Sequence, residues 1–221
     1  MRPLQSETDT APVRIPAGRA IIDADLALPA TPTGLVVFAH GSGSSRTSTR
    51  TRYVASVLQE AGLATLMLDL LTADEERVDR QTREHRFDIP LLAGRLVAAA
   101  DWAKREPRLL ELGLGFFGSS TGAAAALIAA AERPDRTRAV VSRGGRPDLA
   151  DTALEQVQAP TLLIVGGNDA SVVTLNEEAM ARMPAKRELA IVPGATHLFE
   201  ERGKLEQVAQ LARDWLLRWM S

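Results

Sequence analysis

Residues 118–122 read Gly-Ser-Ser-Thr-Gly and stand between two apolar stretches of different character. Residues 112–117 form a short run typical of a buried strand, whereas the alanine-rich residues 123–131 are typical of a helix. A strand that reverses into a helix within two residues strains the backbone of the central residue, Ser120. Side chains two positions before and after Ser120 would collide, so both positions favour glycine. The pattern predicts a nucleophilic serine on a sharp strand-to-helix turn.

Two other interpretations of residues 118–122 stand beside this one. The segment could be a turn of small residues that lets a helix pack closely on a sheet, with no chemical role. Ser119 could be the nucleophile, although it lacks glycines at the required spacing. Residues 112–131 carry no charge and are long enough to cross a bilayer. Their glycines and hydroxyl residues favour a buried strand, a turn and a buried helix.

Short apolar runs alternate with helical patterns on both sides of this segment. The expected strands are residues 35–39, 64–68, 112–117, 139–141, 161–165 and 189–192. The expected helices are residues 53–61, 88–104, 121–132 and 174–181, and a last one carries apolar residues from Leu205 to Trp219. Such alternation predicts the α/β class, with a mostly parallel, twisted sheet and helices on both of its faces.

The regions outside this alternation are short. Residues 13–28 have the pattern of an N-terminal hairpin with its turn at residues 17–18. Residues 1–11 are polar, so we expect a flexible tail there and a single domain over residues 12–221.

The composition narrows the possible functions. The 221 residues are 45% hydrophobic and 24% charged, and the formal net charge is −2. That charge argues against a general nucleic-acid binder. The absence of cysteine excludes disulfides, thiolate metal sites and a cysteine nucleophile. Three scattered histidines do not suggest a metal site, and no secretory signal is visible, so we expect a cytoplasmic protein without a metal or a membrane partner.

Two further loops that follow expected strands carry acid–base residues, Asp169 and His197. Ligands bind at the carboxyl ends of the strands in an open parallel sheet, so these residues and Ser120 are expected at one edge. The chain order serine, aspartate, histidine is that of one class of hydrolase triads. His197 would accept the Ser120 proton, and Asp169 would orient the imidazole. Taken alone, Asp169 could equally be a turn residue, and a lone loop histidine often has no special role.

Residues 40–43 read His-Gly-Ser-Gly and follow the first buried strand. Such a loop supplies one backbone donor of an oxyanion hole, and the residue after the nucleophile supplies the other. We therefore expect the N–H of Thr121 to work with that of Ser42 or a flanking glycine. His40 is expected to brace this loop, and His85 to lie at the surface. Phosphate binding is disfavoured, because the loop lacks both a third glycine and a P-loop lysine.

These motifs resemble those of the α/β-hydrolase superfamily, and more narrowly its dienelactone-hydrolase-like branch. The resemblance rests on residues 40–43, 118–122, 166–169 and 194–197 and extends in element order over roughly residues 13–220. It implies an α/β-hydrolase fold. Larger family members carry a helical cap at the position of residues 142–160, and this chain has no room for a large cap domain there, which favours an open site. Dienelactone hydrolases use a cysteine nucleophile, whereas Ser120 occupies that position here. This difference favours a serine esterase over a lactone hydrolase.

The expected function is therefore that of a serine hydrolase. It would cleave carboxylic esters of small substrates through a covalent acyl-enzyme, with no metal or cofactor. A lactone hydrolase or acyl transferase using the same site is the alternative, followed by a catalytically silent binding module. The expected partner is a small-molecule ester or lactone, and the chain is expected to be a monomer or a homodimer.

Two arginines are candidates for substrate binding. Arg46 lies just beyond the oxyanion loop, and Arg143 follows an expected strand. A guanidinium at either position could bind a carboxylate or a phosphate through two hydrogen bonds. The alternative for both is a salt bridge or a contact with a backbone carbonyl. The charged residues 72–86 are expected to form a solvated loop or helix, or part of the rim of the site.

Overall fold

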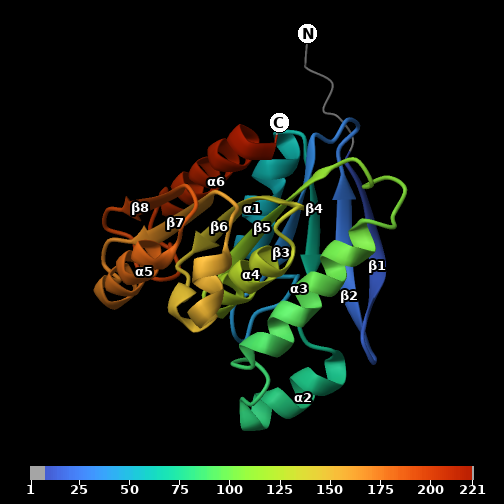
Figure 1. Ribbon diagram of the computed structural model, residues 1–221, viewed down its shortest axis with the longest axis horizontal. Coiled ribbons are helices and arrows are strands. Elements are labelled where there is room, and N and C mark those ends of the chain that lie inside the picture. The colour runs from blue at the N-terminus through green and yellow to red at the C-terminus, as the bar shows by residue number, and fades with distance from the viewer. Residues whose placement is uncertain (1–7, 221) are drawn as a thin grey trace.

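In the computed structural model, which describes residues 8–220, eight strands form one sheet in the order β1-β2-β4-β3-β5-β6-β7-β8 (Figure 1). The strands are β1 (Asp9–Ala17), β2 (Ala20–Leu28), β3 (Gly34–Ala39), β4 (Leu63–Leu68), β5 (Gly113–Ser119), β6 (Thr137–Arg143), β7 (Thr161–Gly166) and β8 (Arg187–Val192). The α-helices are α1 (Thr49–Glu60), α2 (Ala73–Thr82), α3 (Ile89–Ala103), α4 (Thr121–Glu132), α5 (Ala170–Arg182) and α6 (Lys204–Met220), and η1 (Pro147–Gln156) is a 3₁₀ segment.

Six of the strands run parallel, and the N-terminal hairpin runs against them. β1 pairs with β2, and β2 with β4, in antiparallel register, whereas every pairing from β4 through β3 to β8 is parallel. The predicted α/β fold with an N-terminal hairpin is therefore confirmed. A parallel sheet places the carboxyl ends of β3, β5, β6, β7 and β8 at one edge, where their loops form the candidate site.

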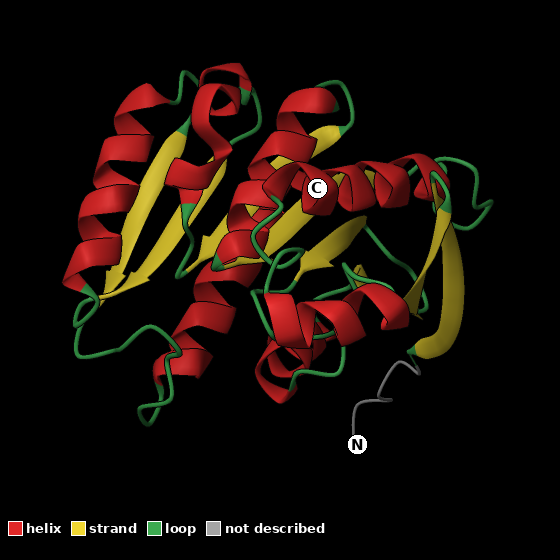
Figure 2. Ribbon diagram, turned by 90° about the horizontal axis from the view of Figure 1, so that it is seen from below, coloured by secondary structure: helices red, strands yellow, loops and turns green. Residues whose placement is uncertain are grey.

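The sheet separates two apolar cores. Successive side chains of a strand point to opposite faces, and both faces of the central strands are covered (Figure 2). In β3, Val36 and Phe38 pack on the face covered by α1 and α6, whereas Leu35 and Val37 pack on the face covered by α3 and α4. All residues of β3 are buried, as expected for a strand covered on both sides.

Part of the range predicted as a tail belongs to the sheet instead. Residues 9–11, assigned to a flexible tail from their polarity, belong to β1, where Asp9 pairs with Leu28 and Ala11 with Leu26. Backbone pairing with β2 is compatible with these exposed side chains, because an edge strand needs no apolar face to form its ladder. Residues 1–7 of that expectation lie outside the described residues.

Two further boundaries differ from the sequence analysis. α5 begins at Ala170, four residues before the predicted start, and β6 continues to Arg143, which was placed after the strand. η1 occupies the connection expected to be too short for a cap, and no large cap domain is present among the described residues. Within the same residues, every helix is too short or too polar to span a bilayer.

Candidate active site

Ser120 is held between β5 and α4 in a strained backbone conformation. Its φ of 51° and ψ of −122° lie outside the regions favoured by L-amino acids. A Cβ at Gly118 would lie 2.5 Å from the Cα of Ala123. A Cβ at Gly122 would lie 2.4 Å from the carbonyl oxygen of His40. Both glycines are therefore sterically required at the positions that the sequence pattern predicts.

Asp169 and His197 meet across two neighbouring loops. His197 Nδ1 donates a hydrogen bond of 2.7 Å to Asp169 Oδ2. The loops are fixed by their backbones, because Asn168 N–H donates to the Ala195 carbonyl oxygen at 2.9 Å, and a Cβ at Gly166 would lie 2.5 Å from that oxygen. The Asp169 side chain is 15% exposed and that of His197 is 40% exposed. Since Nδ1 carries the donated proton, Nε2 is the nitrogen able to accept another.

Asp169 and Ser120 both occupy the N-cap position of a helix without capping it. Asp169 precedes α5 and Ser120 precedes α4, yet neither side chain accepts a hydrogen bond from its helix. An N-cap side chain normally does so and contributes about 1 kcal/mol. Here the carboxylate bonds His197, and the Ser120 hydroxyl makes no hydrogen bond to any residue that the structure describes. The Asp169 carboxylate is thus available to bond His197, and the Ser120 hydroxyl remains without a hydrogen-bond partner among the described residues.

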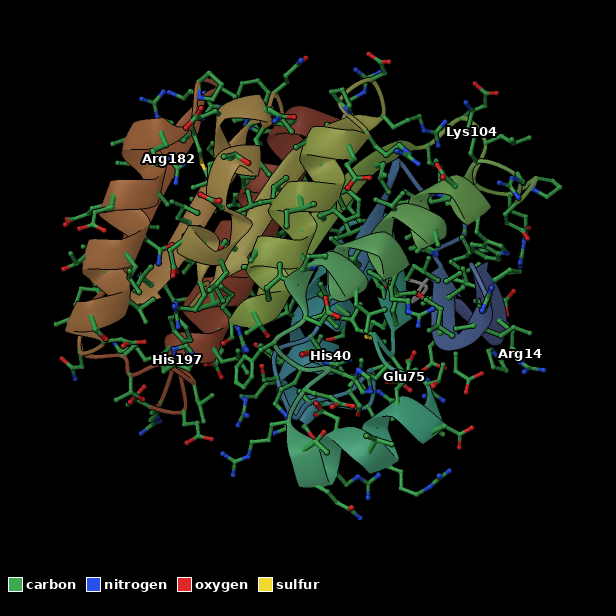
Figure 3. The ribbon with its side chains drawn as sticks, turned by 60° about the horizontal axis from the view of Figure 1, so that its bottom comes forward. Arg14, His40, Glu75, Lys104, Arg182 and His197 are labelled. Atoms are coloured by element: carbon green, nitrogen blue, oxygen red, sulfur yellow. The ribbon has the colours of Figure 1, made fainter. Side chains whose placement is uncertain are left out.

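The segment after β6 touches both Ser120 and His197. Ser120 N–H donates to the Arg143 carbonyl oxygen at 3.2 Å, and the Ser120 carbonyl oxygen accepts from Arg146 N–H at 3.1 Å. A Cβ at Gly144 would lie 3.5 Å from His197 Nδ1, so the imidazole packs directly on this segment. Figure 3 shows His197 and His40 toward the end of the molecule that carries α2. The strained serine and the imidazole are therefore held by one short piece of backbone.

The two residues expected to supply oxyanion donors lie side by side. Ser42 Oγ and Thr121 Oγ1 are 2.9 Å apart in a hydrogen bond. A Cβ at Gly41 would lie 3.1 Å from Ser120 Cβ, so the loop approaches the serine closely. Within the described chain, the backbone N–H groups of Ser42 and Thr121 have no acceptor. That of Thr121 opens α4, where such groups have no partner inside the helix.

His40 fastens the loop of residues 40–43 to the segment that follows β4. Its Nδ1 donates to the Gly41 carbonyl oxygen at 2.9 Å, and its Nε2 accepts from Leu70 N–H at 3.0 Å. Because one nitrogen donates and the other accepts, the ring has to be neutral. Burial is the main cause that lowers the pKa of His40 below its ordinary value. The predicted bracing role of His40 agrees with these contacts.

We expect His40→Ala to lower the free energy of unfolding by about 2–3 kcal/mol, because it leaves the buried Leu70 N–H without an acceptor. The pH dependence has a defined sign. The folded-state pKa of His40 lies below the unfolded value of about 6.5, so its contribution is complete above that pH and is lost as the pH falls through the folded-state pKa. Urea unfolding between pH 5 and pH 8 measures both effects.

His85→Ala is the matched control for this substitution. The His85 ring is partly exposed and faces Glu84 at 3.4 Å, so its removal should change stability by less than about 0.5 kcal/mol. Equal losses in the two variants, or a His40→Ala loss that does not shrink as the pH falls, would contradict the bracing role.

A cavity of about 320 Å³ lies beside the oxyanion loop. Its lining residues are His40, Gly41, Ser42, Gly43, Ser44, Ser45, Asp69, Leu70, Leu71, Glu76, Asp79, Arg80, Arg86, Leu92 and Thr121. Three of these residues belong to α2. Part of the charged segment 72–86 therefore forms a wall of the cavity and is not only a solvated surface. This assignment agrees with the alternative that residues 72–86 contribute to the rim of the site.

Polar contacts hold α2 and its following loop over this cavity. Asp79 is 2% exposed and accepts hydrogen bonds from His85 N–H, Arg86 N–H and Arg86 Nε at 2.9, 2.8 and 2.6 Å. The Arg86 carbonyl oxygen in turn accepts from Ser42 Oγ at 3.3 Å. Burial tends to raise the pKa of Asp79, but the hydrogen bonds from Arg86 and His85 outweigh it and lower the pKa. Asp79 thus remains ionised and ties α2 to the oxyanion loop.

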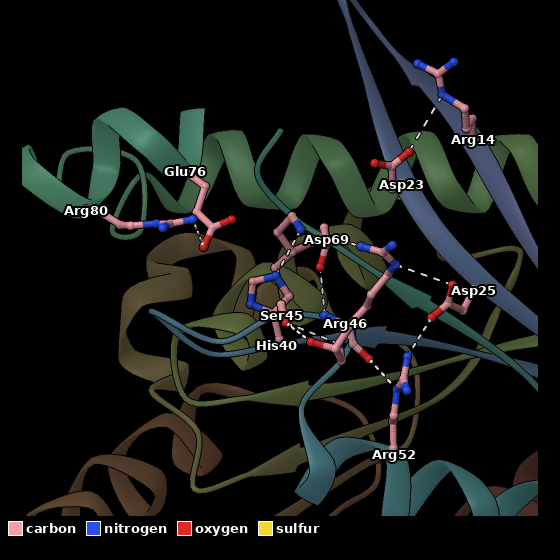
Figure 4. Close-up of polar contacts among 12 residues, drawn as sticks. Arg14, Asp23, Asp25, His40, Ser45, Arg46, Arg52, Asp69, Glu76 and Arg80 are labelled. Carbon is pink, nitrogen blue, oxygen red and sulfur yellow. Dashed lines mark hydrogen bonds and ion pairs between the residues drawn. The ribbon is translucent and has the colours of Figure 1, made fainter. Parts of the chain in front are cut away.

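The two candidate arginines have different surroundings. Arg46 pairs with Asp69 and with Asp25, whose oxygen lies 3.4 Å from Arg46 Nε (Figure 4). This is the salt-bridge alternative considered from the sequence, and both acids compete with any anionic ligand for the Arg46 guanidinium. Arg143 ends β6, and its side chain is buried without a carboxylate partner among the described residues.

Sheet topology, helix arrangement and the loops at the carboxyl edge together define an enzyme of α/β-hydrolase type. The model of the Dienelactone hydrolase family matches residues 22–221, and the chain belongs to that family. A crystal structure of a dienelactone hydrolase from Anabaena variabilis ATCC 29413 has a TM-score of 0.95 and is 54% identical, over 97% of this chain and 99% of that one.

More distant structures share the fold. XC6422 from Xanthomonas campestris, an α/β serine hydrolase without a lid, has a TM-score of 0.77 at 21% identity, over 97% of this chain and 96% of that one.

Two proteins from Mycobacterium tuberculosis, strains CDC 1551 / Oshkosh and ATCC 25618 / H37Rv, are each 57% identical over 205 residues. They carry the name "Putative phosphoribosyl transferase", as MT0597 and Rv0571c. The match covers 93% of this chain and 45% of theirs, so the chain spans about half the length of these relatives.

Proposed function

We propose that this protein is a serine carboxylic-ester hydrolase that acts on small esters through an acyl-enzyme at Ser120. The observation that supports this most directly is the 2.7 Å hydrogen bond from His197 Nδ1 to Asp169 Oδ2. It fixes the tautomer in which Nε2 can act as a base. The Ser120 hydroxyl does not cap its helix, and the Ser120 backbone is strained. The three side chains would form the triad.

In this mechanism, Ser120 Oγ attacks the ester carbonyl carbon while its proton moves to His197 Nε2. Asp169 stabilises the imidazolium that forms. Collapse of the tetrahedral intermediate breaks the bond to the alkoxy group, which leaves as an alcohol after taking the proton from Nε2. Water then attacks the acyl-enzyme carbonyl carbon and gives one proton to Nε2. As this second tetrahedral intermediate collapses, the bond to Ser120 Oγ breaks, Nε2 returns the proton to that oxygen, and the acid leaves.

The backbone N–H groups of Ser42 and Thr121 would bind the oxyanion of the tetrahedral intermediate. Each donor in such a hole contributes about 3–4 kcal/mol to the transition state. The N-terminal end of α4 adds a positive dipole at the same place. The hydrogen bond between the two side chains and the contacts of His40 support this arrangement, because they fix both backbone segments beside Ser120.

A panel of short-chain aryl esters and lactones of matched size, compared by kcat/KM, tests the proposal. Aryl acetates and butyrates should be hydrolysed without added metal, and Ser120→Ala should abolish that turnover. Ester turnover that survives in the folded Ser120→Ala variant would exclude Ser120 as the nucleophile. A folded protein that turns over no substrate of the panel would favour a silent binding module instead.

A lactone hydrolase or acyl transferase is the second candidate. It is favoured by membership in the Dienelactone hydrolase family and by the 54% identity with the Anabaena variabilis enzyme. Lactones with the higher kcat/KM in the same panel would support lactone hydrolysis. Transfer of the acyl group to an added alcohol in place of water would support the transferase. The name of the mycobacterial relatives describes proteins of which this chain spans about half, and the proposal rests instead on the Asp169–His197 hydrogen bond and on the strained backbone of Ser120.

A further inference from the structure

A polar residue lies in the middle of the buried face of α5. The buried residues of this helix are Val172, Asn176 and Ala179, which are spaced as one stripe along its axis. Asn176 is 0% exposed. Asparagine is a weak helix former, and burying its amide is costly unless hydrogen bonds replace those to water. The contacts of this amide therefore have to account for its place on an otherwise apolar face.

The Asn176 amide donates two hydrogen bonds. Nδ2 donates to the Val172 carbonyl oxygen at 2.7 Å, one turn earlier in α5, and to the Gly145 carbonyl oxygen at 3.0 Å. Both partners are carbonyl oxygens, so only the NH₂ side of the amide can satisfy them, and this fixes the orientation of the amide. Oδ1 has no hydrogen-bond partner among the described residues. The favourable polar contribution of the side chain thus comes from its two donated bonds.

The bond to Gly145 fastens α5 to the segment of residues 143–146. This segment makes two hydrogen bonds with the backbone of Ser120, one through its first residue and one through its last. Its second residue packs on the His197 ring. Its third residue, Gly145, is buried, and the carbonyl group of Gly145 is the one that meets Asn176. A displacement of Gly145 would therefore be transmitted to both the serine and the imidazole.

The same helix leads to the proposed acid. Asp169 is the N-cap residue of α5, and its carbonyl oxygen accepts from Val173 N–H at 3.0 Å, which closes the first turn. Asn176 follows after about two helical turns, so it lies on the same face of the helix as Asp169. The helix thus connects the carboxylate that bonds His197 with the amide that bonds Gly145.

We propose that Asn176 is a positioning residue for the triad. Its bond to Gly145 sets the distance between α5, which begins at Asp169, and the segment that holds Ser120 and His197. Asn176 bonds none of the three triad side chains, so it acts through the backbone. The inference rests on the proposed function for its kinetic consequence, whereas the link between α5 and the segment can be measured without turnover.

Two substitutions separate the two hydrogen bonds of Asn176. A serine hydroxyl can donate to the carbonyl one turn earlier but is too short to reach Gly145, whereas alanine has no donor. Misplacing reacting groups by about 1 Å can slow a reaction roughly 100-fold. We therefore expect Asn176→Ser and Asn176→Ala to lower kcat for an aryl acetate by a similar factor, about 10–100-fold, with KM within about threefold. A kcat near that of wild type in Asn176→Ser would mean that the bond to Gly145 does not position the triad.

Ala179→Gly is the matched control. Ala179 lies on the same buried face, and a glycine there weakens the helix without removing a contact of Asn176. This variant should lower the midpoint of urea unfolding and keep kcat within about twofold of wild type. A comparable loss of kcat in Ala179→Gly would show that the rate merely follows the stability of α5, and it would overturn the positioning role.

Hydrogen exchange of backbone amides tests the link without any substrate. The N–H groups of Ser120 and Arg146 form the bonds between the serine turn and residues 143–146, so their exchange reports on that contact. Exchange at both amides should be at least about tenfold faster in Asn176→Ser than in wild type, and unchanged in Ala179→Gly. Unchanged exchange in Asn176→Ser would overturn the link, whether or not the protein is an esterase. Faster exchange in a protein without ester turnover would keep the link and reject the esterase.

Discussion

Ser120→Ala is expected to lower kcat for aryl esters by roughly 10⁴–10⁶-fold, because no other group can form the acyl-enzyme. The fold should not change. The Ser120 hydroxyl makes no hydrogen bond to any residue that the structure describes, and it does not cap α4. Its removal therefore breaks no hydrogen bond within the described residues, and the midpoint of urea unfolding should shift little. Steady-state kinetics together with urea unfolding of the same preparation measure both quantities.

Ser119→Ala is the control for this prediction, because Ser119 was the rival nucleophile in the sequence. It is buried, and its hydroxyl has no partner in the described part of the chain. Its replacement should leave kcat within about twofold of wild type. The opposite pattern, with activity lost in Ser119→Ala and kept in Ser120→Ala, would move the nucleophile to the neighbouring residue and contradict the account.

His197→Ala should reduce kcat by a comparable factor, about 10⁴–10⁶-fold, and the two losses should not add. Without the imidazole, the Ser120 proton has no acceptor at neutral pH, so the serine is no more reactive than an ordinary alcohol. Once Ser120 or His197 has been replaced, replacing the other residue should lower kcat no further. The double variant Ser120→Ala/His197→Ala should therefore match the slower single variant. A double-mutant cycle on a chromogenic ester measures this.

The control for this cycle is again His85→Ala, which removes a histidine that faces Glu84 and has no role in the proposed mechanism. It should keep kcat within about twofold of wild type. Losses in the double variant that equal the product of the single losses would indicate that Ser120 and His197 act independently. That result would reject the relay between them.

The sequence predicted the parts of the site that depend on local backbone chemistry. Gly118 and Gly122 can be predicted because the turn at Ser120 leaves no room for a Cβ. In the structure, a Cβ at either position would collide with neighbouring backbone atoms. The strands could be predicted because those covered on both faces are continuous apolar runs. Asp169 followed from its place after β7, which is such a strand, and His197 from its place after β8, an edge strand that is only partly buried.

The features that the sequence did not predict depend on contacts between residues far apart in the chain. Such contacts leave no periodic pattern in the sequence. The start of α5 was placed four residues late because Asp169 precedes it without capping it, and the carboxylate bonds His197 instead. The role of Asp79 depends on a loop that folds back over it.

The central claim is that the Ser120 hydroxyl is activated by His197, which Asp169 orients. Labelling with a fluorophosphonate, followed by peptide mapping, tests it most directly, because the reagent reacts with activated serines. The account predicts stoichiometric modification of Ser120 in the wild-type protein and none in His197→Ala. A label on another residue, equal labelling of Ser120 without the imidazole, or a well-folded wild-type protein that takes up no label would contradict it.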